Sequence, residues 1–517
     1  MLFNSIDFFL FFAVVTTQYF RAPFLIRWSL ALAGVAFPVF QYGRSPNPIA
    51  ASVFSALGLI ITAVARRRHG ELLARKILLA IASLLFYSAW RWPFTSLLLG
   101  NTLFNYVCVR AVEGTADPRR RRLFLILALV GNLGVLGIFK YTNFILENLE
   151  GLLGLSGLTV DLAGVSILLP LGISFYTFHT MSYVIEVYRG HMRARKSLLD
   201  IILFASFFPQ LVAGPILRAN QFIPQLDECK TWDPRRVKSG LLLMIWGMAK
   251  KLLIADALAP IVNQAYAHPD LYSGPALVLA TYCFAFQIYG DFSGYTDLAI
   301  GASRVLGFDI PINFNRPYFA TNISTFWKRW HISLSTWLRD YLYISLGGSR
   351  CSRSRTLFNL MATMFLGGLW HGATWNFVIW GTIHGVMLVL HRVFLMATGR
   401  GKARDETRPI PWLVLATLNF HLVCLTWVFF RAETLAKAVA VLGRIVQGAP
   451  GLMVPWLFPA VLIPALLAIQ AVQARTTIST FLLRSPRLSR LLIYAGIALM
   501  AVVISSTQPV DFIYFVF

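Results

Sequence analysis

The sequence predicts an all-α protein that crosses a membrane many times as one integrated domain. Hydrophobic residues make up 57% of its 517 residues and charged residues only 13%, a balance typical of a chain embedded in lipid. Lysine and arginine number 46 against 22 acidic residues, and the resulting charge of +24 lies in short clusters between apolar runs. In a soluble protein such a charge would suggest nucleic-acid binding. Between apolar runs it is the pattern of cytoplasmic loops, so we expect membrane lipid around the chain and no nucleic-acid partner.

The first 68 residues are predicted to form a variable N-terminal group of membrane spans, and residues 69–517 the main membrane domain. Apolar runs begin near Phe8, Trp28 and Ile49, and the first two are short for complete spans. No basic leader or small-residue cleavage site precedes them, so we expect the first run to remain in the mature protein.

Three basic clusters alternate with apolar runs in the next part of the chain. Runs 77–90 and 93–109 form a hairpin, run 123–139 crosses outward and run 168–188 returns. Counting these spans places all three clusters on one side of the membrane, which is the cytoplasmic side by the excess of lysine and arginine. The clusters are residues 66–76, 119–122 and 189–196.

Residues 198–217 are apolar but contain Pro209, Gly214 and Pro215. Basic residues flank both sides, so a broken or re-entrant helix fits better than a straight span. Irregular backbone at membrane depth requires protein or water around it, which makes this segment a predicted cavity wall. A single kinked span is the alternative.

Runs 240–261 and 276–302 form the next pair of spans, and the second contains two acidic residues. Asp291 and Asp297 lie inside this apolar helix. Buried carboxylates require partners, so they either pin a distorted backbone or orient a catalytic group. We favour the first interpretation.

Residues 324–344 have the spacing of one amphipathic helix. Ser324 is its expected N-cap, and His331 borders its apolar face. The basic residues on its other faces suit the cytoplasmic interface. The apolar stripe consists of Trp327, Trp330, Leu334, Trp337 and Tyr341.

A second histidine, His371, follows an apolar run, 357–370, that is too short to cross a membrane. Basic loops flank this run and the longer run 375–395. We therefore expect the short run to dip into the membrane and return, which places His371 at a turn. Further spans at 413–430, 456–471 and 491–504 bring the total to about twelve.

The two histidines each follow a tryptophan, and imidazole is the side chain best suited to proton transfer near neutral pH. A neutral His371 in a pocket would take the proton from a hydroxyl group as that group attacks an acyl carbonyl. The alternative is a histidine that only bonds to a backbone carbonyl at a helix turn. The neighbouring Trp370, Gly372 and Trp375 favour the functional interpretation.

Basic residues crowd the cytoplasmic side of the stretch that holds both histidines. Arginine pairs well with phosphate oxygens, so a phosphate-bearing donor would be drawn there. The same charges also serve as an orientation signal, and both interpretations remain open. The residues are Lys328, Arg329, Arg350, Arg353 and Arg355.

The five cysteines are scattered without C-x-x-C spacing, so we expect no metal cluster and no disulfide framework. Cys351 lies in a basic loop, where it either carries an acyl group or has no role; a lone loop cysteine is more often incidental.

Seven segments carry a family resemblance: LPLGISFYTFHTMSYVIEVYRG (169–190), FFPQLVAGPILR (207–218), AKKLLIADALAP (249–260), YGDFSGYTDLAIGASRVLGF (289–308), FWKRWHISLSTWLRDYLYISLGG (326–348), GLWHGATWNFVIWGTIHG (368–385) and FIYF (512–515). On these segments the chain resembles the membrane-bound O-acyltransferase superfamily, and within it the bacterial alginate O-acetyltransferase branch. The likeness extends from about residue 67 to residue 447, with the last segment in addition.

The resemblance implies a bundle of helices around a central tunnel, with a cytoplasmic acyl donor at one mouth and an acceptor or partner protein at the other. It assigns His371 and His331 as the catalytic pair. The expected donor is acetyl-CoA as a co-substrate, with no permanently bound cofactor and no metal. Supporting roles are expected for Asp291, Tyr295, Asp297, Trp330, Asp340, Trp370 and Trp375.

The predicted function is transfer of an acyl group, expected to be acetyl, to hydroxyls of an exopolysaccharide such as alginate, in the bacterial inner membrane. Family members often pass the acyl group to a periplasmic partner that resembles a serine esterase. Two other classes stay open: a proton-coupled transporter and a non-catalytic scaffold for polysaccharide export. The lack of an inverted repeat and the setting of the histidines argue against a transporter, and the presence of both Trp-His motifs argues against a scaffold.

Overall fold

The computed structural model of the chain describes residues 6–20, 62, 67–156, 167–211, 214–399 and 409–472, together with residues 487, 491, 495 and 513. Within these residues it consists of helices and loops and has no β-strand, which confirms the all-α prediction. The predicted run near Trp28, most of the run from Ile49, most of the span 491–504 and most of the 512–515 segment lie outside the described residues.

The helices between residues 71 and 188 follow the predicted order of spans and basic clusters. Lys76 Nζ lies 2.8 Å from Asp200 Oδ1, and Arg121 Nη2 donates to Tyr188 O at 3.1 Å. These contacts bring the three basic ends together on one side, as predicted. These helices are α4 (Glu71–Arg91), α5 (Pro93–Gly114), α6 (Pro118–Leu155) and α7 (Ile173–Tyr188), and α1 (Ile6–Phe20) precedes them.

The segment predicted to be broken is broken. It contains α8 (Leu198–Ser206), the single turn α9 (Phe208–Leu211) and the irregular residues 214–218. Pro209 is buried within α9, and Ile216 N donates to Ser333 Oγ at 2.9 Å. The irregular backbone is thus held by protein atoms of the later site, and its role as a cavity wall stays a prediction. The short helices α10 (Ala219–Phe222) and η1 (Ile223–Asp227) follow.

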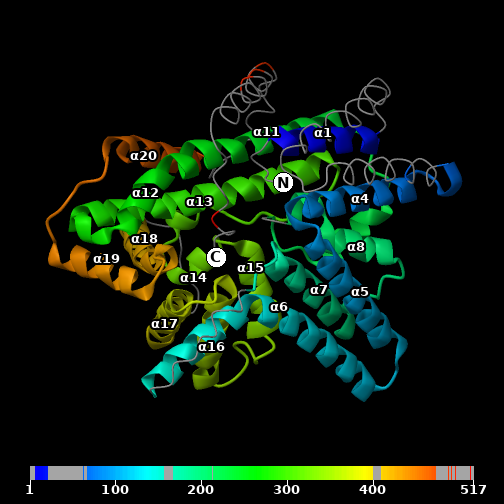
Figure 1. Ribbon diagram of the computed structural model, residues 1–517, viewed down its shortest axis with the longest axis horizontal. Helices are drawn as coiled ribbons and strands as arrows, with labels where there is room; N and C mark the ends of the chain where they lie inside the picture. The colour runs from blue at the N-terminus through cyan, green and yellow to red at the C-terminus, as the bar shows by residue number, and fades with distance from the viewer. Residues whose placement is uncertain are drawn as a thin grey trace.

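The centre of the molecule is a pair of helices that lie side by side (Figure 1). A Cβ added to Gly294 would lie 2.7 Å from Gly247 O, so only glycine permits this approach. The first half of the longer helix packs in one hydrophobic cluster and its second half in another. The elements are α11 (Pro234–Lys250), the π-turn η2 (Lys251–Asp256), α12 (Ala257–Ala267), η3 (Pro269–Leu271) and α13 (Gly274–Val305).

The prediction of a single helix over residues 324–344 is wrong. It is divided into α14 (Ile323–Trp327), α15 (Ile332–Trp337) and the π-helix η5 (Leu338–Tyr343), after the short turn η4 (Pro317–Phe319). Ile332 N donates to Asn313 O at 2.9 Å instead of to the preceding turn, and Asn322, not Ser324, caps α14. The predicted apolar stripe is nevertheless buried along its whole length.

The C-terminal elements begin with a helical hairpin whose first arm is longer than predicted. It covers 19 residues, so it spans about 28 Å and includes Arg353 and Arg355. The predicted length was too short because the helix starts inside the basic loop, where Ser352 is its N-cap. The elements are α16 (Arg353–His371), α17 (Trp375–Ala397), α18 (Pro409–Arg431), α19 (Leu435–Gln447) and α20 (Leu457–Val472).

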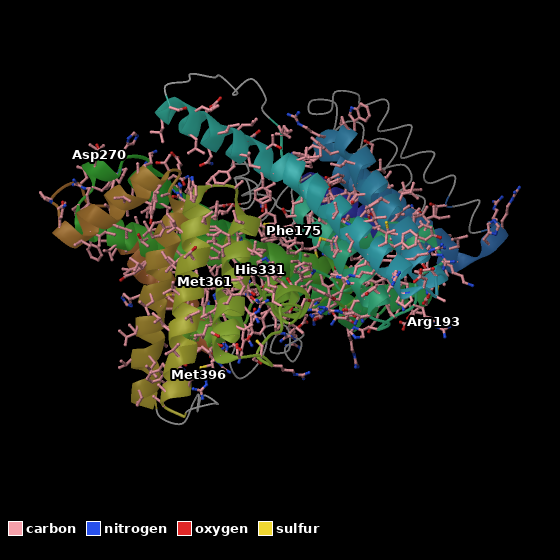
Figure 2. The ribbon with its side chains drawn as sticks, turned by 90° about the horizontal axis from the view of Figure 1, so that it is seen from below. Phe175, Arg193, Asp270, His331, Met361 and Met396 are labelled. Atoms are coloured by element: carbon pink, nitrogen blue, oxygen red, sulfur yellow. The ribbon has the colours of Figure 1, made fainter. Side chains whose placement is uncertain are left out.

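Four of the described helices are long and apolar enough to cross a membrane: α4, α6, α17 and residues 411–431 of α18. This supports a multi-pass membrane protein, whereas the total of about twelve spans and the tunnel stay predictions. In Figure 2, Arg193 and Met396 lie below His331 and Asp270 lies above it. Arg193 and Met396, which lie at or beside basic loops, are thus on one side of His331, and Asp270 is on the other.

Candidate active site

His331 lies at the break between α14 and α15 with a left-handed backbone, φ 42° and ψ 56°. Such a conformation is uncommon for a residue other than glycine and persists only when its surroundings hold it. Here Ser335 N donates to His331 O at 3.0 Å, and Ile332 N is fixed to Asn313 O. The side chain is fully buried, so it is not at an exposed interface as the amphipathic pattern indicated.

Asn313 determines which nitrogen of His331 carries the proton. Asn313 Oδ1 accepts hydrogen bonds from Ser333 N at 3.0 Å and from Ser333 Oγ at 2.9 Å, so this atom is the acceptor. His331 Nδ1, at 3.3 Å from the same oxygen, therefore donates to it. His331 Nε2 has no hydrogen-bond partner among the described residues, which leaves its lone pair available.

His371 is the last residue of α16, and its ring centroid lies 6.4 Å from that of His331. The two predicted catalytic histidines, 40 positions apart in the sequence, are thus brought together. Both are buried, with His371 only 5% exposed. Trp380 and Phe430 contact His371 with ring centroids at 4.9 and 5.5 Å.

Aromatic side chains form the walls around the two imidazoles. Phe292 lies edge-on to His331 with centroids 4.7 Å apart, and Trp370 lies 6.1 Å from His331. Trp330 is buried and packs on Phe314 at 5.0 Å. Trp375 does not join these aromatic side chains: it is 54% exposed.

A stack of rings leads from the two imidazoles to a polar cluster. Phe178 stacks on Trp337 at 3.7 Å and on Trp370 at 5.3 Å, and Trp337 lies 5.2 Å from Tyr341. Each of these contacts falls within or below the usual range for aromatic pairs. The stack joins α7, α15, η5 and α16 at the level of His371.

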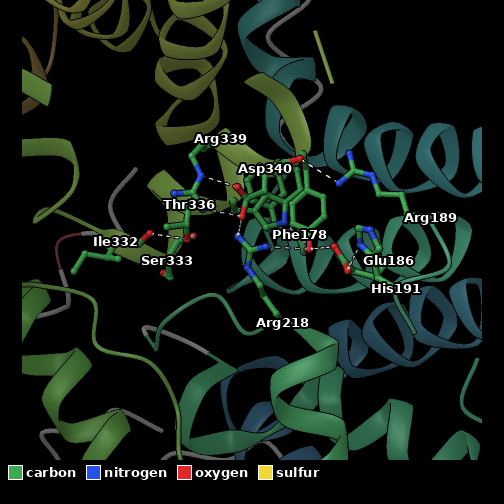
Figure 3. Close-up of polar contacts among 12 residues, drawn as sticks. Phe178, Glu186, Arg189, His191, Arg218, Ile332, Ser333, Thr336, Arg339 and Asp340 are labelled. Carbon is green, nitrogen blue, oxygen red and sulfur yellow. Dashed lines mark hydrogen bonds and ion pairs between the residues drawn. The ribbon is translucent and has the colours of Figure 1, made fainter. Parts of the chain in front are cut away.

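The polar cluster, drawn in Figure 3, contains the predicted supporting residue Asp340. Arg218 Nη2 and Arg339 Nε both approach its carboxylate to 2.6 Å. Burial would raise the pKa of Asp340, but these two guanidinium groups outweigh burial and hold it below its usual value. Tyr341 Oη donates to Glu186 Oε1 at 2.8 Å, so the cluster ties η5 to α7.

The two acidic residues of α13 lie in a separate cluster of buried ion pairs. Lys250 Nζ is 2.7 Å from Asp297 Oδ2, and Lys251 Nζ is 2.9 Å from Asp291 Oδ1. Tyr295 lies beside them, with Lys251 Nζ 5.7 Å from its ring. Their partners are on η2 and the end of α11, so this cluster joins the central helices rather than orienting a histidine.

The predicted donor cluster is only partly gathered. Arg350, Arg353 and Arg355 are exposed around the start of α16. Lys328 is also exposed and lies near His391 towards the end of α17, and Arg329 Nη1 donates to Phe319 O at 3.2 Å. These basic residues lie near one end of the α16–α17 hairpin, and His371 is at the other.

Three residues that bind the histidines directly or through a shared partner were missed from the sequence. Asn313 and Ser333 had no recognisable motif, because their hydrogen bonds form between distant loops. Lys140 directly follows the apolar run 123–139 and is the one charged residue among residues 123–146. Its Nζ donates to the carbonyl oxygens of Trp370 and His371.

Comparisons with known proteins extend these observations. The model of "MBOAT, membrane-bound O-acyltransferase family" matches residues 165–430. The chain is 43% identical over 365 residues to "Probable alginate O-acetylase AlgI" of Pseudomonas aeruginosa, covering 70% of this chain and 68% of that protein. It is 37% identical over 393 residues to a peptidoglycan O-acetyltransferase of Helicobacter pylori, covering 71% and 73%. It is 30% identical over 278 residues to a teichoic acid D-alanyltransferase of Bacillus subtilis, covering 51% and 69%.

Proposed function

The chain belongs to the membrane-bound O-acyltransferase family, in its alginate O-acetyltransferase branch, and from this premise we propose that it transfers acetyl groups to hydroxyls of an exopolysaccharide. The donor is a cytoplasmic thioester, acetyl-CoA, and the protein lies in the bacterial inner membrane. The acetyl group reaches the polymer directly or through a periplasmic partner protein. The observation that carries the proposal is the meeting of two buried imidazoles 6.4 Å apart.

In the proposed reaction an imidazole nitrogen takes the proton of the acceptor hydroxyl as the hydroxyl oxygen attacks the acyl carbonyl carbon. The carbon–sulfur bond then breaks, and the proton passes to the leaving thiolate. The available Nε2 lone pair of His331 and the position of His371 beside it support this chemistry. Asn313 maintains the tautomer of His331 that the reaction needs.

The names of the relatives support a polymer as acceptor. Relatives are named for acetyl transfer to alginate or to peptidoglycan, and a more distant one for D-alanyl transfer to teichoic acid. Acyl transfer onto a cell-envelope polymer is what these names share. The greater identity to the alginate protein favours an exopolysaccharide over peptidoglycan.

The test is mass analysis of acyl groups on the cell-surface polymer from cells with and without the protein. His371→Ala should lower acyl transfer by ~10²–10⁴-fold, because losses of that size follow removal of a general base. His421→Ala, which alters an exposed histidine on α18, is the matched control and should leave acylation unchanged. Full acylation by a well-expressed His371→Ala protein would remove the basis of the proposal, and acetyl on peptidoglycan alone would reassign the acceptor.

A further inference from the structure

We propose that Lys140 of α6 is a positioning residue that holds His371 in place for catalysis; the inference rests on the proposed role of His371. Lys140 Nζ donates to Trp370 O and, at 3.2 Å, to His371 O. The next residue, Tyr141, donates its hydroxyl to Leu369 O at 2.8 Å. Two neighbouring side chains of one helix thus bind three successive carbonyls at the end of another.

These carbonyls need partners because they belong to the last turn of α16. The last four carbonyls of a helix have no intrahelical donor, and an unsatisfied carbonyl in apolar surroundings is costly. The usual left-handed glycine cap is missing here, since Gly372 is extended with φ −162°. Lys140 and Tyr141 supply donors in its place, and a cation at a helix C-terminus is also favoured by the helix dipole.

Lys140 is itself an unusual residue for its place. It lies in α6, a helix that is long and apolar enough to cross a membrane. Charged residues within such helices are rare and generally functional. Its Nζ also lies 5.6 Å from the centre of the Trp370 ring, a cation–π contact. Its ammonium group thus contacts both residues of the Trp-His motif.

The same face of α6 also holds the far side of the turn. Residues four apart on a helix lie above one another, so Phe144 and Asn148 continue the line from Lys140. Phe144 packs edge-on against Trp375 at 5.8 Å, and Asn148 Oδ1 accepts from Trp375 Nε1 at 2.8 Å. The turn between α16 and α17 is therefore fixed to α6 on both sides, and His371 lies within the fixed part.

A positioning role differs from a purely structural one in what it changes. Displacement of a catalytic group by about 1 Å can cost ~10²-fold in rate without weakening substrate binding. We therefore expect Lys140→Met to lower kcat by ~10²-fold while the KM for acetyl-CoA and the melting temperature stay at their wild-type values. Lys140→Arg, which keeps a cationic donor, should recover at least tenfold of the lost kcat.

The measurement is turnover of labelled acetyl-CoA by the full-length protein in membrane vesicles from polymer-producing cells. The matched control is Ile145→Ala, on the same helix but 60% exposed, which should behave as wild type. Wild-type kcat for Lys140→Met would overturn the inference, as would a loss that follows the melting temperature and is not recovered by arginine.

Two further variants keep the result decisive. If Lys140→Met does not insert, Tyr141→Phe removes one of the three bonds without removing a charge, and an unchanged kcat in that variant would overturn the inference. His371→Ala is measured alongside. Wild-type turnover in His371→Ala defeats the proposed function, whereas inactive His371→Ala with fully active Lys140→Met defeats only the inference about Lys140.

Discussion

At the scale of single residues, the site depends on a histidine whose backbone and side chain are fixed by different neighbours. The left-handed backbone of His331 is held by the loop bonds to Asn313 and Ser335, and its ring by Asn313 Oδ1. A substitution at this position therefore tests two properties at once. Asparagine accepts a left-handed backbone more readily than most residues, so His331→Asn removes the imidazole with little backbone cost.

We expect His331→Asn to lose most acyl transfer and to keep its fold, because only the ring chemistry is removed. Combined with His371→Ala, it should cost little more than either change alone, since groups that act in one step are strongly non-additive. The measurement is acetyl-CoA turnover for the single and double variants at matched protein amounts. Losses that multiply in the double variant would indicate that the histidines serve separate steps.

At the scale of helices, the position of His371 depends on how closely α16 and α17 approach. A Cβ on Gly368 would lie 2.4 Å from Phe377 O and 2.9 Å from Gly381 Cα. Both atoms belong to the backbone of α17, so they cannot move aside as a side chain can. The hairpin that presents His371 therefore requires glycine at this crossing.

Gly368→Ala should destabilise the protein by about 1–3 kcal/mol, the usual cost of overpacking, and should lower activity through displacement of His371. Gly443→Ala is the matched control, because a Cβ there meets nothing within 4 Å and alanine favours the helix. Thermal unfolding in detergent measures the stability of both variants, and acetyl-CoA turnover measures their activity. Equal melting temperatures for Gly368→Ala and wild type would contradict the tight crossing.

Helices of this fold could be predicted from the sequence where the local pattern decides them. The α4–α5 hairpin, the broken segment after Ser197 and the pairing of basic ends follow from apolar runs, prolines and charge. The break at His331 could not be predicted, because it is held by bonds to Asn313, which lies 18 positions earlier. Lys140 was missed for the same reason: the sequence marks it as unusual but does not identify the carbonyls it binds.

At the scale of the whole molecule, charge and chemistry lie apart. Exposed arginines surround the start of α16, whereas His371 ends the same helix among aromatic rings. The basic end attracts anionic molecules whether or not it forms a specific site, and salt weakens attraction of that kind. Neutralising the arginines separates a donor site from an orientation signal.

Changing Arg350, Arg353 and Arg355 to glutamine should raise the KM for acetyl-CoA, and added salt should raise the KM of the wild type in the same direction. The matched control changes three exposed arginines at the start of α6, Arg119, Arg120 and Arg122, to glutamine and should leave the KM for acetyl-CoA unchanged. Initial rates at several donor concentrations give both values. A correctly inserted first variant with wild-type donor dependence would make these arginines an orientation signal only.

If these arginines bind the donor, the length of α16 also sets a minimum reach for it. Arg353 and His371 are its first and last residues, so about 27 Å of helix separates them. A donor that stays bound to Arg353 by its anionic groups can present its acyl carbon at His371 only through a flexible arm of that reach. A compact acyl phosphate has no such arm and would have to leave the arginines before it reacted. If the arginines form the donor site, substrate selection by this protein would in part be a measurement of molecular length.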